Sequence, residues 1–151
     1  MPVAAEIASP SAMEEFGARL ARGLKGGLVI YLHGELGAGK TTLVRGVMQG
    51  LGFSGAVKSP TFTLIEPYAI AGLVIYHIDL YRLDRSEELE AIGIRDYLNP
   101  RSVLLIEWPE RGHGELPDAD ARISLSYRKT GRHVELVCMS PPSESLCVAV
   151  A

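Results

Sequence analysis

The chain has 151 residues, of which 47% are hydrophobic and 22% are charged, and its formal net charge is −3 at pH 7. This length and composition predict one globular domain, residues 1–151, with a sizeable apolar core. The negative charge disfavours sequence-independent binding of nucleic acid by the whole surface, because such binding uses lysine and arginine contacts to phosphates. The sequence shows no apolar run of transmembrane length and no secretory signal pattern, so we expect a cytoplasmic protein that does not bind a membrane.

The first predicted element is a helix over residues 12–24. Large apolar side chains recur there at helical spacing, at Met13, Phe16, Leu20 and Leu24. Ser11 is the predicted N-cap, and Glu14 three residues later completes a capping box. We expect this helix to cover a sheet, although its place just before the next strand could bring it to a ligand bound there.

A strand, a glycine-rich loop and a helix form the second predicted unit. Residues 27–33 are a short, nearly continuous apolar run, which predicts a strand buried on both faces. Residues 34–41 match the pattern G-x-x-x-x-G-K-[ST] at each fixed position. After Lys40, apolar side chains recur at helical spacing until Gly50 and Gly52 supply a stop. The loop therefore has the context that a phosphate-binding loop requires.

The residue types of this loop fit the binding of phosphate. Glycines allow a tight turn that brings backbone N–H groups to phosphate oxygens, and the positive end of the following helix favours the same anion. Lys40 adds a mobile positive charge, and the Thr41 hydroxyl is placed to bind Mg²⁺. The predicted nucleotide-binding residues of the loop are Glu35, Leu36, Gly37, Ala38, Gly39, Lys40, Thr41 and Thr42.

The segment after that helix contains Pro60, which excludes a helix there. From Thr61 onward the residue types alternate, which predicts a strand with Thr61 and Thr63 on one face. Two interpretations of these threonines stay open. They reflect β-propensity alone, or they form a switch segment whose hydroxyl senses Mg²⁺ or a γ-phosphate.

A second run, residues 73–82, follows a turn at Ala71 and Gly72, and the short connection predicts an antiparallel hairpin. Asp79 closes the apolar part of this run, where a carboxylate could reach Mg²⁺ or its waters. By period-2 spacing His77, Asp79 and Tyr81 share one face, and three polar residues on one face of an apolar strand more often line a site.

Residues 102–107 give the next strong signal. Four consecutive apolar residues end in Glu107, the pattern of a Walker B strand, whose acid orders Mg²⁺ or the attacking water. Trp108 is the only tryptophan, and it comes directly after Glu107 at the end of this strand. Loops at strand ends often carry functional residues. Between the two strands, Ser86 and the acidic residues after it predict a short, solvated helix start, with a second helical piece at residues 95–98.

The C-terminal third is predicted to contain a hairpin, with strands at residues 121–127 and 133–138 around Thr130 and Gly131. Residues 141–151 are weakly patterned, and we expect them to be loosely ordered. Cys138 and Cys147 lack metal-ligand spacing and are predicted to be free thiols.

Four segments in this order resemble the TsaE (YjeE) family. They are residues 34–42, S-P-T-F-T at 59–63, H-I-D-L-Y-R-L at 77–83 and I-E-W-P-E at 106–110. The phosphate loop alone is shared by many families, whereas the combination is highly specific, and the likeness covers nearly the whole chain. The resemblance implies a small phosphate-loop ATPase that uses ATP and Mg²⁺ in making threonylcarbamoyladenosine in tRNA. It also implies action with the TsaD–TsaB heterodimer, whose turnover the ATPase would support, and contact with tRNA only through that complex.

The same resemblance assigns roles to individual positions. Lys40, Asp79 and Glu107 would be catalytic, and Mg²⁺ would be held by Thr41 with Asp79 and Glu107. Thr61 and Trp108 would join the loop in contacting the nucleotide. Family members often carry threonine near the position of Met13, so the contacts to the base are not defined by this match.

The expected fold is α/β, a three-layer α/β/α architecture like that of phosphate-loop NTPases, with a mixed parallel and antiparallel sheet. The leading functional hypothesis is a Mg²⁺-dependent ATPase, and the alternative is a small-molecule or nucleotide kinase, against which the chain shows no lid or acceptor domain. A GTP-operated switch is disfavoured because no N-K-x-D or D-x-x-G segment occurs. We expect slow hydrolysis by the isolated protein, since no arginine is obviously placed as an internal finger and the nearest candidates are Arg82 and Arg111.

Overall fold

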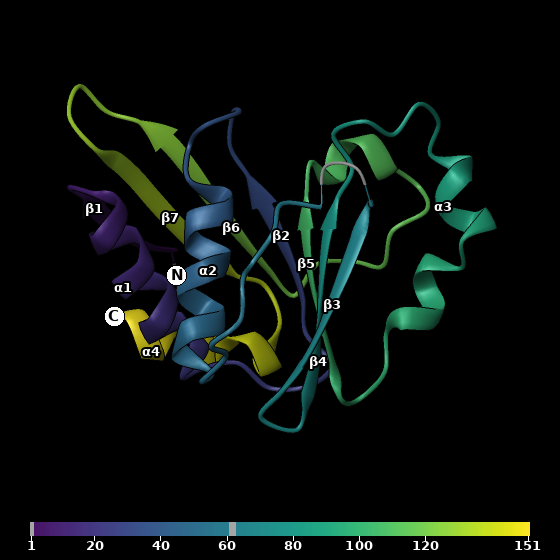
Figure 1. Cartoon of the computed structure of the whole chain (residues 1–151), viewed down its shortest axis with the longest axis horizontal. Helices are drawn as coiled ribbons and strands as arrows, with labels where there is room; N and C mark the ends of the chain where they lie inside the picture. The colour runs from purple at the N-terminus through teal and green to yellow at the C-terminus, as the bar shows by residue number, and fades with distance from the viewer. Residues whose placement is uncertain (1, 61–62) are drawn as a thin grey trace.

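The computed structural model describes residues 2–60 and 63–151. Within these residues the strands form one seven-stranded sheet in the order β1-β7-β6-β2-β5-β4-β3 (Figure 1). The strands are β1 (Pro2–Ile7), β2 (Val29–His33), β3 (Ile65–Ile70), β4 (Leu73–Asp79), β5 (Ser102–Glu107), β6 (Ala121–Tyr127) and β7 (Arg132–Cys138). The helices are α1 (Pro10–Ala21), α2 (Lys40–Gly50), α3 (Glu87–Ala91) and α4 (Glu144–Val150), with 3₁₀ turns η1 (Ile94–Tyr97), η2 (Pro109–Gly112) and η3 (Pro141–Ser143).

The sheet is mixed, as predicted. Strand β2 is parallel to both β5 and β6, and β4 is parallel to β5. The pairs β3–β4 and β6–β7 are the two predicted antiparallel hairpins. Strand β1 was not predicted from the sequence, and it extends the sheet by pairing antiparallel with β7. The carboxyl ends of β2, β4 and β5 therefore lie along one edge of the sheet.

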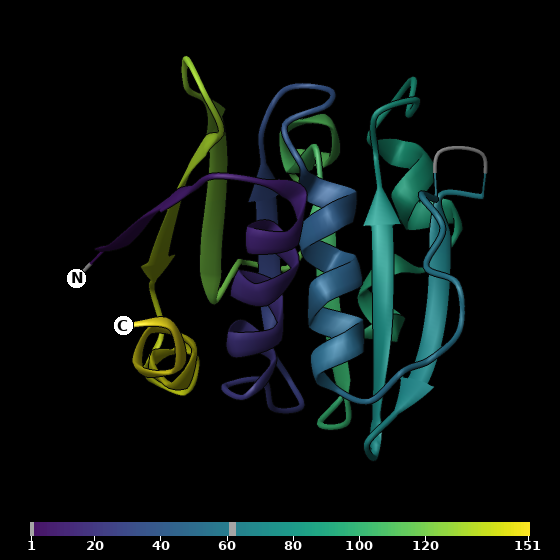
Figure 2. The ribbon, with the colours of Figure 1, turned by 60° about the vertical axis from the view of Figure 1, so that its left-hand side comes forward.

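Helices cover both faces of the sheet, but unequally. Figure 2 shows α1 and α2 side by side on one face, with α4 next to α1. The core on this face joins Phe16 of α1, Met48 of α2 and Leu146 of α4 to the sheet. The other face is covered by the short α3 and the 3₁₀ turns η1 and η2, where Leu89 and Ile94 pack on Ile106. This arrangement confirms the three-layer α/β fold. Among the described residues, no helix has the length and apolar character needed to cross a membrane.

Helix α1 begins earlier than predicted. Its N-cap is Ser9, whose Oγ accepts a hydrogen bond from the Ala12 N–H at 3.1 Å, and not Ser11. Pro10 occupies the first turn, where its fixed φ and missing N–H cost nothing. The helix packs tightly on α2 at Gly46, where there is no room for a side chain. A Cβ at this position would lie 2.3 Å from the Glu14 carbonyl oxygen. This close contact fixes α2, and with it the loop at the start of α2.

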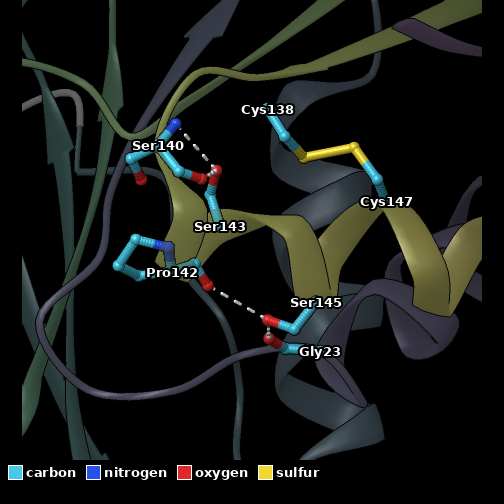
Figure 3. Close-up of a disulfide and its surroundings, with 7 residues drawn as sticks. All are labelled: Gly23, Cys138, Ser140, Pro142, Ser143, Ser145 and Cys147. Atoms are coloured by element: carbon cyan, nitrogen blue, oxygen red, sulfur yellow. Dashed lines mark hydrogen bonds between the residues drawn. A yellow bond between two sulfur atoms is a disulfide. The ribbon is translucent and has the colours of Figure 1, made fainter. Parts of the chain in front are cut away.

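Two predictions for the C-terminal segment are wrong. Residues 141–150 are ordered into η3 and α4, and the Leu146 side chain of α4 is fully buried. Cys138 and Cys147 are not free thiols but form a disulfide that joins the end of β7 to α4 (Figure 3). The turn at η3 reverses the chain and brings the two cysteines together, with a Cα–Cα distance of 6.6 Å. Ser145 also ties α4 to the end of α1, since its Oγ donates to the Gly23 carbonyl at 2.6 Å.

Strand β3 begins later than predicted. It starts at Ile65, and Leu64 before it has a positive φ of 70°, so the chain turns there. The strand predicted to begin at Thr61 therefore does not include residue 64. Thr61 and Phe62 lie outside the described residues.

Candidate functional site

The predicted phosphate loop lies between β2 and α2, at the carboxyl edge of the sheet. Gly34, Gly37 and Gly39 all have positive φ values, of 155°, 79° and 111°. These angles favour glycine, and they let the loop curl back over the start of α2. Helix α2 begins at Lys40, and its N-cap is Gly39, which has no side chain that could accept hydrogen bonds from the first-turn N–H groups. The first-turn N–H groups are thus left for a ligand, at the positive end of the helix dipole.

Lys40 points its ammonium group back into the loop. Its side chain is 5% exposed and donates a hydrogen bond to the Gly34 carbonyl. The Nζ atom lies 3.9 Å from Oε1 of Glu107 and 4.1 Å from the ring centroid of Trp108. Burial lowers the pKa of Lys40, and the nearby Glu107 carboxylate opposes that shift. An ammonium held in this way faces the space enclosed by the loop.

The two predicted acids lie on neighbouring parallel strands. Asp79 of β4 pairs in register with Glu107 of β5, so both carboxylates leave the sheet at the same level. Both side chains are buried, with relative exposures of 7% and 3%. Burial raises the pKa of Asp79, and the hydrogen bond from the Tyr81 N–H, at 3.0 Å, opposes that shift. The strand register thus brings together two acids that are 28 residues apart in the sequence.

His77 contacts one of these acids directly. It lies on β4, its side chain is fully buried, and its Nε2 is 2.5 Å from Oε2 of Glu107. Sequence reasoning placed His77 on the same face as Asp79 but did not connect it with Glu107. That contact depends on the register of β4 against β5, which a single sequence does not specify.

One cleft of about 380 Å³ joins most of the predicted site residues. Its lining contains Leu36, Gly37, Gly39, Lys40, Thr41, Thr42, Asp79, Glu107 and Trp108, together with Ser59, Tyr81 and Arg82. Two predicted residues are not in this lining. Glu35 lines a neighbouring open cleft with Trp108, and the fully buried Ala38 faces α1. Thr61 is outside the described residues, so its predicted contact is not located.

Trp108 forms one wall of this cleft. It follows Glu107 directly and has a φ of 57°, in the left-handed region, which turns the chain sharply into η2. The centre of its ring lies 5.0 Å from the centre of the Tyr81 ring. The Arg111 guanidinium lies 5.4 Å from the centre of the same Tyr81 ring. The tryptophan is therefore held between the loop lysine and the segment after β4.

The β6–β7 hairpin supports the loop from its outer side, which the sequence reasoning missed. The Tyr127 hydroxyl donates to the Leu36 carbonyl at 2.5 Å, and Arg132 reaches the Gly37 carbonyl at 3.4 Å. The Arg132 guanidinium also lies 4.4 Å from the centre of the Tyr127 ring. These contacts follow from the parallel pairing of β6 with β2, which places the end of β6 beside the loop, and the sequence carries no direct signal for that pairing.

The residues at the cleft suit a magnesium ion bound together with phosphates. Among the described residues, no group of three or more His, Cys, Asp or Glu side chains could hold a metal ion by itself. Magnesium usually takes only one or two carboxylates from a protein, and completes its shell with phosphate oxygens and water. The Thr41 hydroxyl with Asp79 and Glu107 offers such a partial set of oxygen ligands, and the two buried carboxylates fit a site that gains positive charge.

The fold and this cleft define a phosphate-loop α/β protein. Residues 7–134 match the family model described as threonylcarbamoyl adenosine biosynthesis protein TsaE. The chain belongs to the TsaE family. This confirms the resemblance drawn from the four sequence segments.

Individual relatives agree with the family match. The tRNA threonylcarbamoyladenosine biosynthesis protein TsaE of Haemophilus influenzae is 56% identical over 113 residues, which are 75% of this chain and 72% of that protein. The protein of the same name from Bacillus subtilis is 36% identical over 126 residues, 82% of this chain and 77% of that protein. The crystal structure of Bacillus subtilis YdiB superposes with a TM-score of 0.84 at 28% identity, covering 99% of this chain and 94% of that one.

Proposed function

We propose that this protein is a Mg²⁺-dependent ATPase that acts with the TsaD–TsaB complex in the threonylcarbamoyladenosine modification of tRNA. Membership of the TsaE family supports the pathway, because the relatives carry tRNA threonylcarbamoyladenosine biosynthesis in their names. The observation that carries the ATPase is the meeting of a phosphate-loop lysine with two buried strand-end acids in one cleft. A loop that only binds phosphate has no need of the second acid, whereas hydrolysis uses one acid at the metal and one at the water.

The chain's own residues divide the work of hydrolysis. The loop N–H groups and Lys40 bind the β- and γ-phosphates and stabilise the charge that develops on the transferred group. Thr41 and one of the two acids hold Mg²⁺, which when bound neutralises phosphate charge. The other acid orients the attacking water. Trp108 and the loop form walls of the cleft, and with a nucleotide bound they would limit the access of other water molecules.

A second pocket beside the loop suits the nucleoside part of ATP. It has a volume of about 230 Å³ and adjoins the loop at Gly37, Ala38 and Gly39. Its other walls come from the start of α1, including Met13, and from the turn of the β6–β7 hairpin. An apolar thioether wall favours contact with a flat base through dispersion, and Met13 supplies it in this chain.

Removal of the Lys40 charge tests the ATPase. We expect Lys40→Ala to lower the rate of ATP hydrolysis by about 10²- to 10³-fold, as for other preorganised donors to a transition state. Lys25→Ala is the matched control, because Lys25 is exposed and does not line the cleft. Hydrolysis by Lys40→Ala at the wild-type rate, in a protein with an unchanged melting temperature, would contradict the proposal.

The role in the complex needs a separate measurement. We expect the isolated protein to hydrolyse ATP slowly and the addition of TsaD–TsaB to raise the rate. Under multiple-turnover conditions, tRNA modification by TsaD–TsaB should depend on this chain and be lost with Lys40→Ala. Modification that continues equally without the chain would rule out the support of turnover, even if ATP hydrolysis were confirmed.

A further inference from the structure

His77 is the only polar side chain on β4 that is fully buried and also contacts one of the proposed catalytic acids, Glu107. It shares a face of β4 with Ile75, which packs in the core beneath α1 and α2. A histidine at such a position loses its hydration, and an apolar residue of similar volume would avoid that cost. The burial of this histidine therefore requires a contact that offsets its cost.

That contact is made by one imidazole nitrogen. Nε2 lies 2.5 Å from Oε2 of Glu107, which is a hydrogen-bond distance between the ring and the carboxyl group. The other nitrogen, Nδ1, has no hydrogen-bond partner among the described residues. A buried group with one unmade hydrogen bond is destabilising by itself. The only polar contact of this ring that the described residues provide thus goes to Glu107.

The two oxygens of the Glu107 carboxylate have different surroundings. Oε2 is occupied by His77, while Oε1 faces the phosphate loop, 3.9 Å from Nζ of Lys40. A free glutamate side chain could rotate and present either oxygen, or neither, to the cleft. With the hydrogen bond in place, one oxygen is fixed toward the space where the phosphates would lie.

We propose that His77 is a positioning residue that holds the Glu107 carboxylate with Oε1 directed at the phosphate loop. The inference rests on the proposed function, because it assigns His77 a part in ATP hydrolysis through Glu107. His77 itself does not line the cleft, so it would act through Glu107 and not on the nucleotide directly. Its contribution is orientation, which is most valuable in the transition state, where a displaced carboxylate would bind metal or water poorly.

The test compares His77→Leu, which removes the hydrogen bond, with His77→Gln, which keeps an amide N–H at about the reach of Nε2. We expect His77→Leu to lower kcat for ATP hydrolysis by about 10- to 100-fold, as for other partners that orient metal ligands, and to leave KM for ATP within about threefold. His77→Gln should recover most of kcat. Ile75→Val is the matched control, a fully buried neighbour on the same face, and should lower the melting temperature without changing kcat.

Equal kcat for wild type and folded His77→Leu would overturn the inference, and so would equal losses for the Leu and Gln variants. If His77→Leu does not fold, His77→Asn replaces it, because its amide is one methylene short of Glu107 and should not rescue. A crystal structure of the variant gives a readout that needs no hydrolysis: the Glu107 carboxylate should leave its place in the Leu or Asn variant and keep it in the Gln variant. An unchanged carboxylate overturns the positioning role, whereas failure of the ATPase itself would appear as wild-type protein without Lys40-dependent hydrolysis.

Discussion

The disulfide between Cys138 and Cys147 gives a prediction whose size follows from the structure. It closes a short loop, with a sequence separation of 9, that contains the turn η3 and the start of α4. The chain-entropy relation for a loop of this length gives a stabilisation of about 2.6 kcal/mol at 25 °C. For 151 residues, with an unfolding entropy of about 2.1 cal/mol/K per residue, this corresponds to a melting temperature about 8 °C lower after reduction.

The assay is thermal unfolding of the oxidised protein, the reduced protein and the variant Cys138→Ala/Cys147→Ala. The chain has no other cysteine, so a reductant acts on this bond alone. Reduced protein and double variant should melt at similar temperatures, both below the oxidised protein, and the reductant should not affect the variant. Helix α4 should remain folded in all three, because its Leu146 side chain is fully buried in the core and does not depend on the bond for that apolar contact. A reductant that leaves the melting temperature of the wild-type protein unchanged would refute the reasoning.

Three further predictions concern packing, pH and the loop. Gly46→Ala should destabilise the fold by about 1–3 kcal/mol, because the added Cβ meets the α1 backbone, whereas an exposed helical glycine would gain stability from the same change; urea unfolding distinguishes the signs. Burial lowers the pKa of His33 below 6.5, so the contribution of the neutral imidazole to stability is present above pH 6.5 and is lost as pH falls through the folded-state pKa. The melting temperature of His33→Gln should therefore fall less in acid than that of wild type, and an equal fall would contradict this. Tyr127→Phe removes the hydrogen bond to the Leu36 carbonyl and should raise KM for ATP about 3- to 10-fold with little change in melting temperature; an unchanged KM would mean that the hydroxyl does not hold the loop.

The parts of the fold that could be predicted are those with a strong local pattern. The apolar run of β2, the glycine loop and the stripe of α2 each signal their structure within a few residues, and so do β5 and Glu107. The predicted N-cap, Ser11, is wrong because Ser9 and Ser11 offer the same hydroxyl group. The feature that favours Ser9 is Pro10, which suits the first turn of the helix. Strand β1 was missed because an edge strand takes much of its stability from its partner, here β7, which is more than a hundred residues away.

The candidate site was predictable for the same reason, and its supporting contacts were not. Lys40, Asp79 and Glu107 each belong to a local pattern, so their convergence followed from the expected parallel strands. The contacts of His77 with Glu107 and of Tyr127 with Leu36 need the register of one strand against another. The disulfide needs the chain reversal at η3, which depends on the packing of α4 against α1. These are tertiary relations, and one sequence without relatives contains no direct signal for them.

Trp108 makes the cleft observable by optical spectroscopy without a label. It is the only tryptophan in the chain, and its indole ring lies over the Lys40 ammonium and beside the Tyr81 ring. Any ligand that draws the ammonium away from the indole changes the electric field at the chromophore. The emission of this one residue should therefore report occupancy of the phosphate loop in real time, and stopped-flow fluorescence could follow nucleotide entry and departure in the unmodified protein.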